Sequence, residues 1–115
     1  MKGLVLVGSG QIEWREFEKP APKAGQALVK MKAASLNRRD EWIKEGKYPN
    51  IRFGAILGSD GSGVVESVGD EKDKEWVGKE VVINPNVNWG PDPNFQGKNY
   101  SILGMPVNGT FSEYC

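Results

Sequence analysis

The sequence predicts a mostly β domain with one short helix. Short runs of alternating or β-branched residues recur along the chain, and glycine, proline or asparagine bounds each run, which is typical of strands. Only one segment has the start and stop residues of a helix. A chain of 115 residues fits one domain that can bury roughly two-thirds of the surface its unfolded chain exposes. Periodicity alone leaves a β-barrel, a sandwich and an OB-type barrel open.

Three strands are predicted in the first part of the chain. Residues 4–7 and 12–15 have strand patterns, and Gly8-Ser9-Gly10 between them is typical of a tight hairpin connection. The proline- and glycine-containing segment 20–25 breaks the pattern. A third strand is predicted over 27–33.

The one predicted helix follows the third strand. Asn37 can serve as its N-cap, and Asp40 lies three residues later, at the spacing of a capping box. Trp42 and Ile43 supply a small apolar face, and Gly46 stands where a C-terminal glycine ends a helix. The helix therefore has about two to three turns.

The rest of the chain contains short strands separated by loops. Residues 70–74 are polar and predict a loop, and the asparagines, prolines and glycines of 84–104 predict a long one. Residues 55–57 lead into a glycine-rich segment. Further strands are predicted over 64–65, 81–83 and 110–111.

Composition excludes several classes of function. Fifteen Lys and Arg balance fifteen Asp and Glu, so no net charge attracts nucleic acid or an anionic membrane, and no apolar stretch is long enough to span a bilayer. Histidine is absent and Cys115 is the single cysteine, which removes the usual zinc ligands, an intrachain disulfide and any histidine-activated nucleophile. Cysteine usage gives no support to secretion, so we expect a cytoplasmic protein.

The glycine-rich segment from Leu57 to Gly69 contains the carboxylate Asp60 and leads into a β-branched strand. A phosphate-binding glycine loop follows a strand and opens a helix. This segment therefore does not predict a nucleotide phosphate site.

Four motifs in order carry a family resemblance: Asn37-x-x-Asp40, Gly58-Ser59-Asp60, Gly78 to Val82, and Gly109 to Tyr114. Together they resemble the N-terminal catalytic domain of the medium-chain dehydrogenase/reductase superfamily. Zinc enzymes of that superfamily usually carry a Cys and a Gly-His-Glu at the first two places, so the chain looks like the zinc-free, quinone-oxidoreductase-like branch. The resemblance implies a GroES-like, partly open β-barrel.

The same resemblance implies candidate site residues. Asn37, Asp40 and Tyr48 are candidate catalytic residues, and Asn37 and Arg39 are candidate cofactor-binding residues. Asn37 would hydrogen-bond near the nicotinamide, with Asp40 and Arg39 organising the polar floor. The alternative is that Asn37 and Asp40 only cap the helix. We favour the site for Asn37 and capping for Asp40.

Three further residues are candidates for the substrate pocket: Trp42, Ser59 and Asp60. Trp42 would be pocket wall or core, Ser59 stands where zinc enzymes have a ligand histidine, and Asp60 would have a supporting role. Ser59 is not a candidate nucleophile because no base is available to activate it. The phenol of Tyr48 could give a proton to a reduced substrate, or Tyr48 could be a rim residue beside Pro49.

The resemblance implies a quinone or enone reductase or an alcohol dehydrogenase-like enzyme. Such an enzyme transfers hydride between NADP or NAD and a small-molecule quinone, enone or carbonyl, here without zinc. Residues 1–115 would form the substrate-side domain, and the nucleotide-binding Rossmann domain expected after it is absent from this chain. We expect the chain alone to be inactive, as an excised domain or a truncated product, and a homo-oligomer is left open. One alternative is a stand-alone barrel for binding or scaffolding. A nucleic-acid-binding barrel is disfavoured by the zero net charge.

Overall fold

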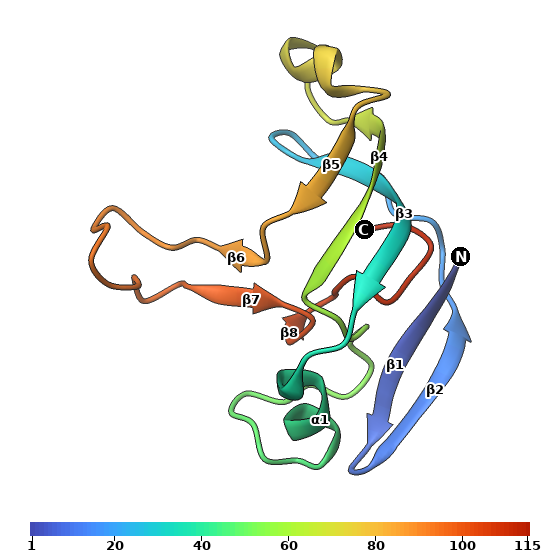
Figure 1. Ribbon diagram of the computed structural model, residues 1–115, viewed down its shortest axis with the longest axis vertical. Coiled ribbons are helices and arrows are strands. Elements are labelled where there is room, and N and C mark those ends of the chain that lie inside the picture. The colour runs from blue at the N-terminus through green and yellow to red at the C-terminus, as the bar shows by residue number, and fades with distance from the viewer.

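Eight strands and two short helices make up the computed structural model, which describes residues 1–115 (Figure 1). The elements of the first half are β1 (Lys2–Gly8), β2 (Gln11–Glu16), β3 (Ala27–Ser35), α1 (Arg38–Lys44) and β4 (Asp60–Val68). The second half contains the 3₁₀ helix η1 (Glu71–Trp76), β5 (Glu80–Ile83), β6 (Asn86–Val87), β7 (Ser101–Leu103) and β8 (Pro106–Val107). The mostly β prediction is confirmed.

The strands form three small sheets, with the orders β1-β2, β3-β4-β5 and β6-β7-β8. All pairs are antiparallel except β7 and β8, which are parallel. The predicted hairpin between β1 and β2 is confirmed: Gly8 pairs with Gln11, and Gly10 between them has φ of 72°. Glycine fits this turn because it adopts positive φ without strain.

Residues 109–115, which we call the C-terminal strap, connect the first two sheets. The strap makes single bridges to β1, between Gly3 and Ser112, and to β3, between Lys30 and Tyr114. The strand predicted at 110–111 is therefore wrong as a regular strand, because the segment passes from one partner strand to the other. The strap completes a barrel that stays partly open, as predicted.

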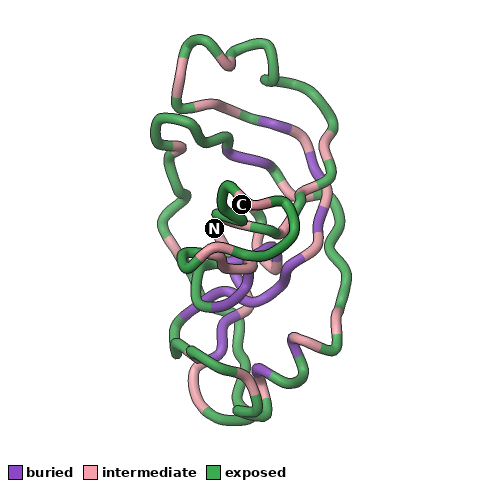
Figure 2. Tube along the Cα trace, turned by 90° about the vertical axis from the view of Figure 1, so that its left-hand side faces the viewer, coloured by how far each residue is buried: buried purple, intermediate pink, exposed green.

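The hydrophobic core lies where β1 packs on α1 and on the extended segment before β4 (Figure 2). The extended segment runs along β1: the backbone N–H of Leu6 donates to the carbonyl of Ala55 at 3.3 Å. The five residues of the core cluster are Leu6, Ile43, Ala55, Leu57 and Met105. The core therefore fixes the helix beside the glycine-rich segment.

Glycines inside β4 let this strand approach β3 closely. A Cβ on Gly63 would lie 2.1 Å from the carbonyl oxygen of Lys30, and a Cβ on Gly61 would lie 2.4 Å from Cε of Met31. The strand begins at Asp60, so the glycine-rich segment enters a strand, as its sequence predicted. Among the glycines of the segment from Leu57 to Gly69, only Gly58, just before the strand, has positive φ, at 94°.

The polar loop predicted at 70–74 is wrong, because this stretch forms η1. Asp70 has the extended conformation of an N-cap, and Lys74 lies 3.2 Å from Glu71 across one turn of the helix. Short 3₁₀ turns of this kind commonly connect strands. The chain therefore has a second helix beside the single one predicted. Neither helix is long and apolar enough to cross a lipid bilayer.

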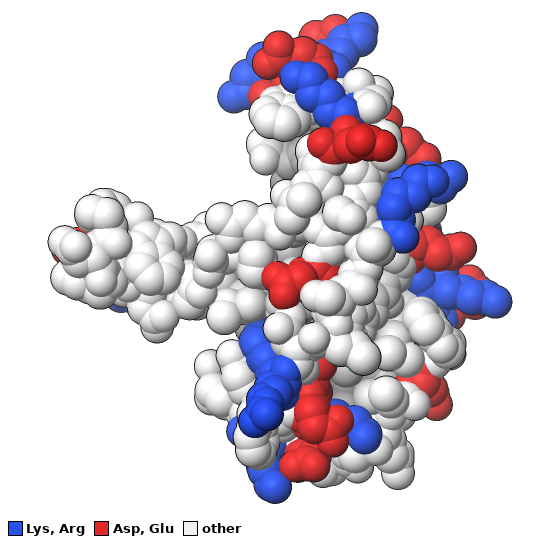
Figure 3. Space-filling view, in the orientation of Figure 1, with Lys and Arg blue, Asp and Glu red and all other residues white.

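Residues 84–103, which we call the arm, stand away from the barrel (Figure 1). A loop was predicted over this region, and that prediction is wrong where β6 and β7 pair. Trp89 packs edge-on against Tyr100, with ring centroids 5.2 Å apart. No residue of the arm is buried, and Asp92 and Lys98 are its only charged side chains (Figure 3).

Candidate functional site

The candidate site begins at the N-terminus of α1, which Asp40 fixes in place. The Asp40 carboxylate accepts the backbone N–H of Asn37 at 2.9 Å and that of Gly58 at 3.3 Å. Its side chain is buried, with 6% exposed. A buried carboxylate needs such partners, and here they join the helix to the segment before β4.

The side chain of Asn37 reaches across to β4. Its amide Nδ2 donates to the Asp60 carboxylate at 2.6 Å, although the two residues are 23 positions apart. Thr110 of the C-terminal strap donates its hydroxyl to the carbonyl oxygen of Asp60 at 2.9 Å. Asn37 and Asp60 therefore form a polar pair that is held from three elements.

Arg39 is the centre of a second network. Its Nε donates to the Tyr48 hydroxyl at 2.9 Å, and Nη1 donates to the Ser59 hydroxyl at 3.0 Å. The same Nη1 reaches the carbonyl of Leu103 at 3.0 Å, and Nη2 reaches that of Met105 at 2.8 Å. One guanidinium thus joins α1, the segment before β4, the end of the arm and the loop that follows it.

Tyr48 is the aromatic residue of this network. Its ring packs against the core cluster, and the Arg39 guanidinium carbon lies 4.8 Å from the ring centroid. The hydroxyl oxygen accepts from Arg39, so the hydroxyl proton is directed elsewhere. Ser59 differs, because its hydroxyl proton is already donated to the carbonyl of Leu103 at 2.9 Å.

Trp42 is placed outside both networks. Its side chain is 46% exposed, and its ring lies 5.7 Å from the Lys47 ammonium. The two networks therefore bring together six of the sequence-predicted residues and leave one aside. The six are Asn37, Arg39, Asp40, Tyr48, Ser59 and Asp60.

Three glycines pack backbone to backbone behind the site. A Cβ on Gly109 would lie 1.9 Å from the carbonyl oxygen of Gly58, and a Cβ on Gly104 would lie 2.6 Å from that same oxygen. No side chain fits between these segments. The glycines let the C-terminal strap and the loop after the arm reach the positions that the networks require.

The residues at the site do not fit a zinc ion. Zinc in proteins is bound mainly by cysteine and histidine, with some carboxylates. No group of three or more His, Cys, Asp or Glu in the chain could hold a metal ion. The side chain of Asn37 is instead hydrogen-bonded to Asp60. The hydroxyl of Ser59 accepts from Arg39 and donates to the carbonyl of Leu103.

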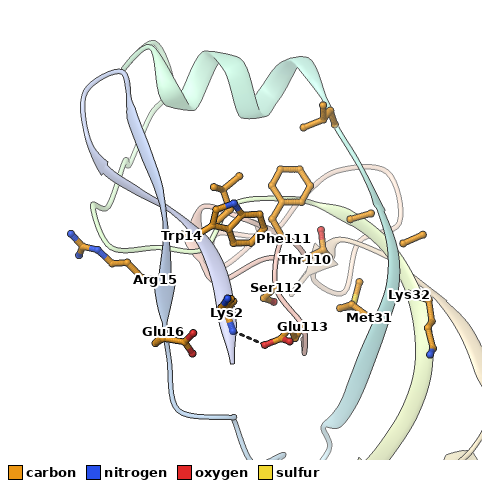
Figure 4. A pocket seen from close by; sticks show the side chains of 14 residues that line it. Lys2, Trp14, Arg15, Glu16, Met31, Lys32, Thr110, Phe111, Ser112 and Glu113 are labelled. Carbon is orange, nitrogen blue, oxygen red and sulfur yellow. Dashed lines mark hydrogen bonds between the residues drawn. The ribbon is translucent and has the colours of Figure 1, made fainter.

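A groove of about 950 Å³ lies beside these networks (Figure 4). It lies between the β1-β2 hairpin, β3 and the C-terminal strap, and Leu4, Trp14 and Phe111 are among its apolar walls. Lys2 donates its backbone N–H to the Glu113 carboxylate at 2.7 Å across one end. The Arg39 network does not line this groove, so hydrogen-bond geometry, and not cavity size, identifies the candidate site.

Sequence reasoning missed three partners of the site. Thr110 lies in the Gly-Thr-Phe motif near the end of the chain, and that motif was the only available indication of its role. The carbonyls of Leu103 and Met105 are backbone groups more than 60 positions from Arg39, and no side-chain pattern reports them.

Comparison with known proteins agrees with this architecture. The model of one family, the alcohol dehydrogenase GroES-like domain, matches residues 23–115. The chain belongs to this family. It is an N-terminal GroES-like domain of the medium-chain dehydrogenase/reductase superfamily, as the motifs predicted.

Two curated relatives show the extent of the similarity. A zinc-type alcohol dehydrogenase-like protein of Schizosaccharomyces pombe is 37% identical over 95% of this chain and 32% of its own length. The starvation-sensing protein RspB of Escherichia coli is 32% identical over 99% of this chain and 35% of its own length. The chain thus spans about a third of the length of the curated relatives that it matches.

Solved structures give the same result for the fold. The crystal structure of an Escherichia coli alcohol dehydrogenase, RspB, complexed with NADH matches all of this chain and 35% of its own, with 28% identity and a TM-score of 0.89. A structure of an NAD-dependent alcohol dehydrogenase matches all of this chain and 36% of its own, with 33% identity and a TM-score of 0.85. The GroES-like fold is confirmed.

Proposed function

We propose that this chain is the substrate-side domain of an NAD(P)H-dependent oxidoreductase that reduces a quinone or an enone without zinc. The observation that carries this proposal is the Tyr48 hydroxyl, whose oxygen accepts from Arg39 while its proton is directed elsewhere. A hydroxyl held in this way can donate to the oxygen of a bound substrate.

The nicotinamide would supply the hydride, and the residues of this chain would orient the substrate and provide the proton. Asn37 is proposed to contact the nicotinamide. Support comes from the 2.6 Å hydrogen bond to Asp60, which fixes the orientation of the Asn37 amide. Asp40 then serves this arrangement indirectly, because it fixes the backbone of Asn37.

The zinc-independent chemistry is supported by the donor set at the site. The position of the zinc-ligand histidine is occupied by Ser59, which accepts from Arg39 and donates to Leu103. A hydroxyl held between these partners is a poor zinc ligand compared with cysteine or histidine.

The nucleotide-binding part is proposed to come from a longer polypeptide. Support comes from the relatives, which are about three times longer than this chain, and from the NADH in the Escherichia coli structure. Within this chain, the glycine-rich segment enters β4 and does not open a helix. We therefore propose that residues 1–115 alone do not turn over.

The experiment is to extend the chain with its downstream coding sequence and measure NAD(P)H oxidation with a quinone and with an enone. We expect turnover by the extended protein, none by residues 1–115, and no stoichiometric zinc by elemental analysis after dialysis. One zinc ion per chain, lost together with the activity on chelation, would overturn the zinc-free proposal. An extended protein that binds neither cofactor would support the stand-alone binding or scaffolding hypothesis instead.

A further inference from the structure

Arg39 is a partly buried cation without an acidic partner. The six ion pairs of the chain do not include it. All four hydrogen bonds of its guanidinium go to neutral oxygens, those of Tyr48, Ser59, Leu103 and Met105. A positive charge in such surroundings favours the formation of a negative charge next to it.

We propose that Arg39 is a positioning residue for Tyr48, and that it supplies the positive charge that a metal ion provides in zinc enzymes. This inference rests on the proposed function and replaces the expectation that Arg39 binds the cofactor. All three nitrogens of the Arg39 guanidinium already donate hydrogen bonds within the chain. A cofactor phosphate that made a bidentate contact would have to compete with these acceptors for two donors of the guanidinium.

The substrate carbon gains a hydride from the nicotinamide, and the substrate oxygen gains the proton of the Tyr48 hydroxyl, whose O–H bond breaks. The electron pair of that bond stays on the phenolate oxygen, which lies 2.9 Å from Nε of Arg39. A proton from water then restores the hydroxyl. The nicotinamide is oxidised and the quinone or enone is reduced by two electrons.

The geometry of the guanidinium matters as well as its charge. Nε and Nη1 point to Tyr48 and Ser59, while Nη1 and Nη2 point to the carbonyls of Leu103 and Met105. A lysine ammonium carries the same charge on one atom and cannot reach these acceptors in the same plane. We therefore expect the Arg39→Lys variant to lose turnover in the extended enzyme, although lysine keeps the positive charge.

The first test uses residues 1–115 and needs no turnover. The ¹³Cζ chemical shift of Tyr48 is measured by NMR in the parent, in Arg39→Ala and in Arg38→Ala. The side chain of Arg38 is exposed and makes no hydrogen bond or ion pair, so Arg38 is the matched control. We expect a shift change only in Arg39→Ala, reversed by millimolar ethylguanidinium and not by ethylammonium. An unchanged Tyr48 resonance in Arg39→Ala would overturn the proposal, whatever the activity of the longer protein.

The second test uses the extended enzyme and separates positioning from cofactor binding. In Arg39→Ala and Arg39→Lys, we expect kcat to fall tenfold or more, in the range of general acid catalysis of ~10² to 10⁴, while KM for NAD(P)H changes less than about twofold. Ethylguanidinium should raise the kcat of Arg39→Ala. A large increase in KM for NAD(P)H with kcat retained would overturn the proposal and restore Arg39 as a cofactor ligand. If Arg39→Ala fails to fold, Arg39→Gln provides the same comparison.

Discussion

The candidate site and the arm use the same kinds of residues in opposite ways. At the site, Asp40 and Arg39 bond to segments far away in the sequence, and Tyr48, the partner of Arg39, packs against the buried core. In the arm, Trp89 and Tyr100 contact each other and near neighbours, and no residue is buried. The site is therefore fixed by the whole barrel, whereas the arm is fixed mainly by itself.

This difference separates local from global stability. Burial of apolar surface supplies most of the free energy of folding, and that surface belongs to the barrel. The arm meets the barrel at Leu103, whose carbonyl accepts from both Arg39 and Ser59. Changes at the site should affect the unfolding of the whole chain, while changes in the arm should affect only the arm.

The largest effect expected from a change beside the site is on stability, from Gly109→Ala. The added Cβ would lie 1.9 Å from the carbonyl oxygen of Gly58, and backbone cannot move aside as a side chain can. We expect a loss of roughly 3 kcal/mol in the free energy of unfolding, at the upper end of the range for overpacking. Urea titration measures it. Gly8→Ala is the control, because its Cβ would meet only the flexible Gln11 side chain, and it should cost less than about 0.5 kcal/mol.

Asn37→Asp should give the next largest effect, because it places a second carboxylate 2.6 Å from Asp60. We expect a loss of about 1–3 kcal/mol at pH 7 that shrinks toward pH 4, where one carboxyl takes up a proton. Thermal unfolding at both pH values measures it.

The double variant Asn37→Asp with Asp60→Asn reverses donor and acceptor and should recover most of the loss. Equal stability of Asn37→Asp and the parent at pH 7 would mean that Asn37 only caps α1.

In the arm, Trp89→Ala should have a small global effect. The edge-on pair with Tyr100 contributes about 0.5–1.5 kcal/mol, and it stabilises the arm alone. We expect faster amide exchange within the arm and little change in the barrel. Leu6→Ala, in the buried core, is the contrasting variant and should cost about 2–5 kcal/mol. Cooperative loss of the barrel on Trp89→Ala would contradict the separation of the two regions.

The smallest effect is expected at the surface pair Lys19–Glu66. The hydrogen bond to Glu66 raises the pKa of Lys19, and the same bond lowers the pKa of Glu66. Its contribution is therefore lost as pH falls through the lowered pKa of Glu66 and as pH rises through the raised pKa of Lys19. Lys19→Met should lower the melting temperature slightly at pH 7, and about 0.5 M salt should remove the difference. A difference that persists in salt would show that Lys19 contributes by packing.

Local patterns were enough to predict most of the barrel. The strands and α1 follow from β-branched runs, from the Asn37 cap and from Gly46, whose φ is 77°. Sequence did not predict η1, because its stability depends on the strands that it connects. The pairing of β6 with β7 was missed because two- and three-residue strands leave no periodic pattern.

The site was predicted as a set of residues and not as networks. Asn37 and Asp40 share a motif, but the contact of Asn37 with Asp60 depends on how α1 packs on β4. The role of Arg39 depends on the carbonyls of Leu103 and Met105, which any residue type could provide. Long-range backbone contacts of this kind follow from the fold alone.

Tyr48 provides the most direct test of the proposed chemistry. In the extended enzyme, Tyr48→Phe removes one oxygen from the site, and Tyr100→Phe removes the same atom from the arm. We expect kcat for enone or quinone reduction to fall tenfold or more in Tyr48→Phe and to stay unchanged in Tyr100→Phe, with both proteins folded. Equal turnover by Tyr48→Phe and the parent would contradict the assignment of Tyr48 as the proton donor.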